Sequence, residues 1–186
     1  MKIKWIENSF PYTGQELRHL FAYEKFGLTG DSLVAWAGPC HISLDDMIDG
    51  EDQFENAQIC GDEMLHFIGE FFHPQIFFAV AFQRLFASIC LEELWRQNPE
   101  LLGKIRRSGD DLYVGDQKLS ISIATIGHFS AMIHFALNIR NEGTPVPTCA
   151  LNDFQIEPEK FAKAVLEKVR SEYESIVFAT QKVHPL

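Results

Sequence analysis

The strongest constraint on the fold of this chain is the stretch 106–139, RRSGDDLYVGDQKLSISIATIGHFSAMIHFALNI, which predicts three consecutive β-strands. The first, 111–114, is short and β-prone, and the dipeptide Gly115-Asp116 that follows it is typical of a tight hairpin turn. Over 118–124, and again over 130–139, apolar residues alternate with polar or small ones. A period of two is the pattern of strands that bury one face. Short turns between such strands predict antiparallel pairing.

The same alternation predicts which side chains share a face of the sheet. Successive side chains of a strand point to opposite faces, so Lys118, Ser120 and Ser122 are expected on one face and the apolar residues between them on the other. In the following strand, His134 and Asn138 alternate with apolar residues in the same way. We expect these five polar side chains to lie on one side of the sheet and to border the main pocket.

These strands also resemble a known superfamily. A strand that carries Asp111, a turn, Lys118-Leu119-Ser120 and then 136–139, ALNI, resemble the core of the lipoate and biotin protein ligase and octanoyltransferase superfamily, where the pattern is KISxxx…ALNV. The resemblance implies the class II synthetase-like catalytic fold and a contact between Lys118 and an acyl carbonyl or an adenylate phosphate. It implies a small acyl ligand or an acyl carrier as partner, with ATP or an acyl-adenylate as the candidate cofactor. At this length the whole chain also resembles a family of unknown function that is structurally related to those ligases.

A cysteine extends the resemblance to covalent chemistry. In the octanoyltransferases a loop cysteine some thirty-odd residues beyond the lysine takes the acyl group, and Cys149 stands 31 residues after Lys118. Ala150-Leu151 replaces the glycines that follow the cysteine in that family. The resemblance implies that Lys118 lowers the pKa of the Cys149 thiol, which then attacks a thioester. Two alternatives stay open: noncovalent, ligase-like acyl binding through Lys118, and a binding or regulatory domain without catalysis.

The segment 44–56, LDDMIDGEDQFEN, is acidic and does not match a metal-binding motif. Met47 and Ile48 stand where an EF-hand needs oxygen ligands, so we expect a solvated acidic loop and no metal site, with a magnesium or partner surface as the alternative. The resembled ligases carry a glycine- and arginine-rich loop here, RRxSGG or similar. This chain has 59–62, ICGD, instead, which argues against ATP-dependent adenylation because phosphate-binding donors are missing.

Two further stretches supply candidate binding residues. Residues 64–72, MLHFIGEFF, alternate strongly and predict a central strand with His66 and Glu70 on one face. About 13 Å separates residues four apart on a strand, so these two side chains are expected to have separate roles. The basic cluster 104–107, KIRR, precedes the three strands, and a solvated turn is favoured over an anion-binding role, for which Arg107 is the candidate.

Two amphipathic helices are predicted, over 77–97 and from Pro158 to about residue 175, because apolar residues recur there at helical spacing. Residues 141–153 are a loop by composition, and 176–182 is interpreted as a closing strand. Together these elements predict an α+β fold of biotin and lipoate ligase type, a mixed, largely antiparallel sheet with helices on one face.

Composition sets the remaining bounds. With 186 residues, 46% of them hydrophobic, a single globular domain over 1–186 is expected. Neither a run of about 20 apolar residues nor a signal-peptide core is present, so we expect a cytoplasmic protein that is not embedded in a membrane. A net charge of −10 disfavours nucleic acid as a partner. The four cysteines show no CxxC spacing and are interpreted as free thiols. A homodimer stays open.

Overall fold

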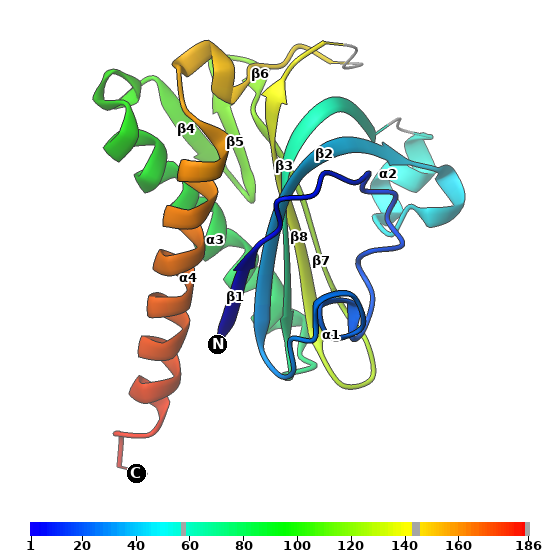
Figure 1. The fold of residues 1–186 in the computed structure, drawn as a ribbon, viewed down its shortest axis with the longest axis vertical. Coiled ribbons are helices and arrows are strands. Elements are labelled where there is room, and N and C mark those ends of the chain that lie inside the picture. The colour runs from blue at the N-terminus through cyan, green and yellow to red at the C-terminus, as the bar shows by residue number, and fades with distance from the viewer. Residues whose placement is uncertain (57–58, 143–145, 185–186) are drawn as a thin grey trace.

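The structure is a computed structural model and describes residues 1–56, 59–142 and 146–184. Its centre is a five-stranded mixed sheet in which β1 runs parallel to β2 and the other neighbours are antiparallel (Figure 1). In spatial order these strands are β1 (Lys2–Trp5), β2 (Ser32–Ile42), β3 (Ile59–Phe71), β8 (Ala131–Arg140) and β7 (Ser120–Ile126). A second, three-stranded antiparallel sheet consists of β4 (Ile105–Ser108), β5 (Asp111–Val114) and β6 (Gln117–Lys118).

Two long helices, α3 (Ile76–Gln97) and α4 (Pro158–Thr180), pack on one face of the five-stranded sheet, called the helix face below (Figure 1). Phe86 of α3 lies 5.3 Å from Phe67 and 5.1 Å from Phe135, measured between ring centroids, so the helix packs directly on the two central strands. Each large apolar side chain buried in such a core contributes about 1.5–3 kcal/mol. The mixed sheet with helices on one face confirms the predicted α+β fold.

The strand predicted over 176–182 is wrong, because α4 continues to Thr180. Ile176 packs against the same core as Tyr173, three residues earlier, so the helical spacing persists where a strand was expected. Neither glycine nor proline interrupts this part of the chain. In the loop predicted over 141–153, residues 143–145 lie outside the described part, and the end of that stretch forms the short helix η3 (Leu151–Phe154).

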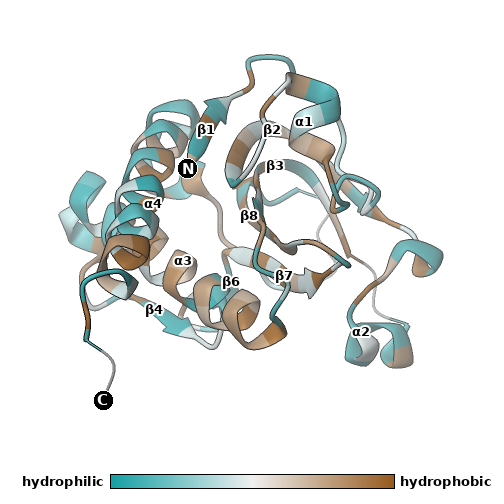
Figure 2. Cartoon of the chain, turned by 90° about the horizontal axis from the view of Figure 1, so that it is seen from below, coloured by the Kyte–Doolittle hydropathy of each residue, from teal (hydrophilic) through white to brown (hydrophobic). Residues whose placement is uncertain are grey.

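The other face of the sheet carries His66 and His134 and is called the histidine face. It is covered by the segment 6–28, which contains α1 (Phe21–Phe26), and by the segment 43–56, which contains η1 (Leu44–Asp46) and α2 (Gly50–Glu55). Figure 2 shows α1 and α2 across the sheet from α3 and α4. The expected acidic loop is therefore partly helical, because the side chains of Ser43 and Asp49 cap the two short helices.

The segment 6–28 crosses β2 at Gly38. The ring nitrogen of Trp36 donates to the carbonyl oxygen of Phe10 at 2.9 Å, and the backbone N–H of Tyr12 donates to the carbonyl of Pro39 at 2.8 Å. A Cβ atom on Gly38 would lie 2.0 Å from the Phe10 oxygen, so this close approach of two backbones requires glycine. The crossing places Tyr12 on the histidine face.

The strand register corrects the expected grouping of polar residues. Ile123 pairs with His134 and Ser122 with Phe135, so Ser120 and Ser122 point to the helix face, opposite to the two histidines. The alternation breaks at Leu119, which lies between β6 and β7, is buried in the helix-face core and donates its N–H to Leu112 in the small sheet. One extra residue at such a break reverses the parity of every side chain after it.

Candidate functional site

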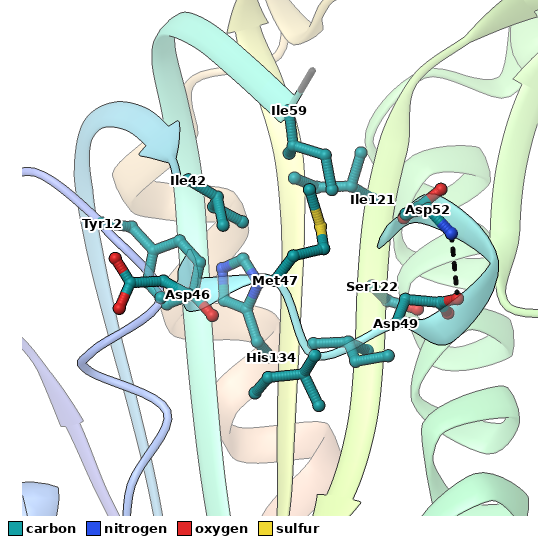
Figure 3. A pocket seen from close by; sticks show the side chains of 13 residues that line it. Tyr12, Ile42, Asp46, Met47, Asp49, Asp52, Ile59, Ile121, Ser122 and His134 are labelled. Atoms are coloured by element: carbon teal, nitrogen blue, oxygen red, sulfur yellow. Dashed lines mark hydrogen bonds between the residues drawn. The ribbon is translucent and has the colours of Figure 1, made fainter. Parts of the chain in front are cut away.

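A small cavity lies on the histidine face, between the sheet and the segment 43–56 (Figure 3). Ile121, Ile123 and His134 line it from β7 and β8, Tyr12 lines one side, and Met47 lines it beside the His134 ring. Its volume is about 40 Å³, room for about three water molecules. The lining is mainly apolar with a few polar groups, which is the usual character of a small-molecule site.

Two buried histidines are the polar centre of the site. Nδ1 of His66 lies 3.1 Å from Nε2 of His134, and Nε2 of His66 lies 3.1 Å from the carbonyl oxygen of Gly38. Burial lowers the pKa of His66 to about 4, and burial next to His66 lowers the pKa of His134 well below its ordinary value. Both rings are therefore neutral at pH 7. The sequence had placed His66 and His134 as candidate binding residues, and the structure brings them together.

Aromatic rings hold the histidine pair in place. Tyr12 stacks on His134 with 3.7 Å between ring centroids, and Trp36 stacks on His66 at 5.1 Å. Tyr12 is 1% exposed, and its burial raises the pKa of the phenol, so the hydroxyl stays protonated. Sequence reasoning missed Tyr12 because it lies outside any periodic element, and its position depends on the crossing at Gly38.

Carboxylates contribute the charged part of the cavity lining. Asp46, Asp49 and Asp52 line it from the segment 43–56, and none of the described residues that line it is lysine or arginine. Burial and the neighbouring Asp49 raise the pKa of Asp52, while the charge of Lys118 lowers it. Lys118 thus acts electrostatically on a residue of the cavity. In the described part of the chain, no group of three or more histidine, cysteine, aspartate or glutamate side chains is arranged to hold a metal ion.

Lys118 belongs to a polar cluster beside the cavity. Its ammonium group lies 2.8 Å from Oδ2 of Asp111, and the hydroxyl of Ser120 donates to the other oxygen of that carboxylate at 3.4 Å. Burial raises the pKa of Asp111. Burial also opposes the charge of Lys118, but the ion pair with Asp111 outweighs this effect, so the pKa of Lys118 is raised. Lys118 is therefore a fixed cation at neutral pH, about a third exposed.

Cys149 and Lys118 are neighbours through the backbone. The Cys149 N–H donates to the Lys118 carbonyl at 3.1 Å, and the side-chain amide of Asn138 donates to the carbonyls of both residues, at 3.2 Å for Lys118 and 3.1 Å for Cys149. The thiol is 3% exposed and contacts the Gln117 carbonyl at 3.6 Å, and burial raises its pKa to about 11. This geometry keeps the thiol protonated, and a catalytic role for Cys149 stays a prediction.

One predicted site residue lies apart from these groups, and another borders the cavity with its hydroxyl already paired. Arg107 is exposed on β4 and donates to the carbonyl of Gly109 within its own hairpin. Ser122 borders the cavity, yet its hydroxyl accepts from the Gln83 side chain at 2.7 Å and donates to Asp110 at 2.6 Å. These bonds tie β7 to α3. The structure therefore separates a histidine cavity from a Lys118 cluster, where the sequence predicted one group.

Comparison with known proteins identifies the family. Residues 1–184 match the model of a domain of unknown function, DUF366. The chain belongs to the DUF366 family. A solved structure described as a protein of unknown function from Pyrococcus horikoshi is 34% identical, with a TM-score of 0.91 over 100% of both chains. The uncharacterized protein MJ0805 of Methanocaldococcus jannaschii is 29% identical over 100% of this chain and 86% of its own length.

The DUF366 fold is also similar to that of a ligase. Biotin protein ligase from Aquifex aeolicus, solved in complex with biotin and ATP, superposes with a TM-score of 0.61 over 91% of this chain and 69% of its own. The sequences are only 9% identical, so the likeness shows a shared fold. It confirms the ligase-like architecture that the Lys118 and Asn138 strands predicted. Among the described residues, no helix has both the length and the apolar character needed to cross a membrane.

Proposed function

We propose that this DUF366 chain binds a small, largely apolar acyl compound noncovalently in the cavity of the histidine face. The observation that supports this most strongly is an apolar cavity with a buried polar centre on a fold that is similar to a ligase solved with biotin and ATP. In this proposal Ile121, Ile123 and Met47 contact the apolar body of the ligand. Lys118, beside the cavity, acts on the site through the positive charge that it places near Asp52 of the lining.

The charge of the site favours binding over adenylation. A triphosphate needs cationic side chains or a row of backbone donors, and the charged residues that line this cavity are Asp46, Asp49 and Asp52. Lys118 is held by Asp111 at 2.8 Å and has Asp52 within electrostatic range, so its charge is largely compensated. ATP is therefore the less favoured ligand of the two that the ligase fold suggests.

Ligand entry requires the segment 43–56 to move. Small-molecule sites have volumes of about 300–1,000 Å³, whereas this cavity measures about 40 Å³. Met47 is 8% exposed and lines the cavity beside the His134 ring, where a ligand would pack (Figure 3). Methionine is unbranched and adapts its shape at low cost, so its side chain suits a cover that is displaced by a ligand.

Thermal unfolding with added compounds tests the proposal. We expect octanamide to raise the melting temperature in proportion to the logarithm of its concentration, because a ligand that binds only the folded state stabilises it by about 2.7 kcal/mol at one hundred times its Kd. The Ile121→Trp variant should lose this response, because the indole fills the cavity. Ile126→Trp is the matched control, since Ile126 is on the same strand but 41% exposed. A response to ATP alone, retained in Ile121→Trp, would contradict the proposal.

A second candidate is covalent acyl transfer through Cys149, which the backbone pairing with Lys118 favours. Iodoacetamide labelling at pH 7.5 separates the two candidates. With a pKa near 11 and 3% exposure, Cys149 is expected to react at least tenfold more slowly than a small model thiol. Labelling of Cys149 faster than the model thiol, and slowed by Lys118→Ala, would instead establish an activated nucleophile.

A further inference from the structure

We infer that the cavity selects its ligand by a hydrogen-bond donor: an uncharged molecule whose buried end carries an N–H or O–H group, such as a primary or secondary amide or an alcohol, donates to Nδ1 of His134. This inference rests on the proposed function and adds the chemical class of the ligand. It distinguishes an amide or alcohol from the corresponding carboxylate and from analogues without a donor hydrogen.

The positions of two protons follow from the carbonyl group of Gly38. A carbonyl oxygen only accepts hydrogen bonds, so the His66 nitrogen 3.1 Å from it, Nε2, carries a proton. A neutral imidazole has one N–H, which leaves Nδ1 of His66 as an acceptor. The atom 3.1 Å from that acceptor, Nε2 of His134, must then be the donor. In the neutral His134 ring the remaining nitrogen, Nδ1, is therefore an acceptor.

This acceptor has no partner among the described residues, and it is not one of their fully buried unpaired atoms, so it keeps accessible surface where His134 lines the cavity. His134 is 1% exposed and lines the cavity, and no hydrogen bond joins its Nδ1 to any residue in the described part of the chain. Figure 3 shows the His134 ring between Tyr12 and Met47, and all three residues line the cavity. Buried polar atoms in folded proteins almost always have partners. A ligand that fills the cavity without donating a hydrogen would bury Nδ1 and leave it unpaired.

A protonated His134 could donate a hydrogen bond from Nδ1 to an anionic ligand, but the surroundings of the ring oppose its protonation. Tyr12 from the segment 6–28 and His66 from β3 contact the ring as uncharged groups, and Asp46, Asp49 and Asp52 line the cavity from the segment 43–56. Protonation on Nδ1 would place a charge on a buried ring that lies next to a second histidine. A carboxylate ligand would therefore face the acceptor Nδ1 of His134 and the three aspartates of the lining, and His134 would offer it no hydrogen-bond donor.

A series of C8 compounds tests this selection on the unchanged protein by isothermal titration calorimetry at pH 7.5. Octanamide and N-methyloctanamide, which both have an N–H, are expected to bind at least tenfold more tightly than N,N-dimethyloctanamide and octanoate. N-methyloctanamide is the control for the added methyl group. 1-Octanol, which has an O–H donor, is likewise expected to bind more tightly than methyl octyl ether, which has none. Equal Kd values for donors and non-donors, or tighter binding of octanoate, would overturn the inference while leaving the proposed function intact. No binding of any compound would overturn both.

A variant adds a second readout. His134→Phe keeps a ring under Tyr12 and removes the acceptor, so the preference for octanamide over N,N-dimethyloctanamide should fall to less than twofold. His41→Phe, at an exposed histidine of β2, is the matched control and should keep the full preference. A preference that survives in His134→Phe would overturn the assignment of the acceptor. Because the loss of His134 unpairs Nδ1 of His66 and can impair folding, the wild-type series decides the inference by itself.

Discussion

Replacing Glu70 with alanine is expected to lower the free energy of unfolding by about 3 kcal/mol or more. Glu70 is 4% exposed on β3, and its carboxylate accepts from Nδ1 of His19 at 2.7 Å, from the Ser130 hydroxyl at 2.8 Å and from the backbone N–H of Leu20 at 3.1 Å. Leu20 has a φ of 61°, a left-handed conformation that is uncommon for leucine. Alanine leaves these donors without their acceptor, two of them in the segment 6–28 that also carries Tyr12.

Urea unfolding of Glu70→Ala against Glu24→Ala measures this effect. Glu24 lies on α1 in the same segment, about half exposed, and pairs with Arg18. Exposed ion pairs contribute about 0.2–1 kcal/mol, so the Glu24→Ala change should have a small effect. If both variants lose the same small amount, Glu70 does not hold the segment 6–28 on the sheet. Octanamide binding should also weaken in Glu70→Ala, because Tyr12 belongs to that segment and lines the cavity.

Stability is expected to fall as the pH decreases from about 6.5 to 4, because of His66. Its pKa is lowered to about 4 in the folded protein by burial, whereas an unfolded histidine titrates near 6.5. Between these values the unfolded state binds more protons, so the free energy of unfolding rises with pH and drops on acidification. The slope is about 1.4 kcal/mol per pH unit, or about 3 kcal/mol over the whole window. His134 acts in the same direction.

Urea unfolding at several pH values from 7.5 to 4.5 tests this dependence. The His66→Gln variant should show a shallower slope than the wild type, whereas His41→Gln, at an exposed histidine, should keep the wild-type slope. The range ends at pH 4.5 because of Glu93: burial opposes its charge, but hydrogen bonds from Arg96 and other neighbours lower its pKa to about 2. The stabilisation from Glu93 is present above pH 4.5 and is lost as the pH falls toward 2, so it does not contribute within the range. Identical slopes for wild type and His66→Gln would contradict a buried neutral His66.

Local periodicity predicted most of the fold, and it also placed both histidines correctly. The period of two over 64–72 and 130–139 defined β3 and β8 well enough to put His66 and His134 on the face opposite to their phenylalanine neighbours. The helical spacing after Pro158 located α4. Such patterns can be read from neighbouring residues alone, because side chains return to the same face every two residues in a strand and about every 3.6 residues in a helix.

The errors arose where contacts between distant residues decide the outcome. The alternation of 118–124 is broken by the hydrogen bond from Leu119 to Leu112, which belongs to a different sheet, and this reversed the expected faces of Ser120 and Ser122. Tyr12 and Met47 come from segments without periodicity and reach the cavity through tertiary packing alone. A pattern of polar residues along one strand cannot show such neighbours, so the sequence predicted Lys118 as the centre of the pocket.

The most direct test of ligand binding on the histidine face is a ¹H–¹⁵N correlation NMR titration of the full chain with octanamide. The binding account predicts that the largest shift changes occur at the backbone amides of Tyr12, Met47, Ile121 and His134, and that amides of α3 buried against the helix face, such as Phe86, change little. Saturable changes confined to the helix face, or to β4 around Arg107, would contradict it, as would a spectrum that does not respond to the compound.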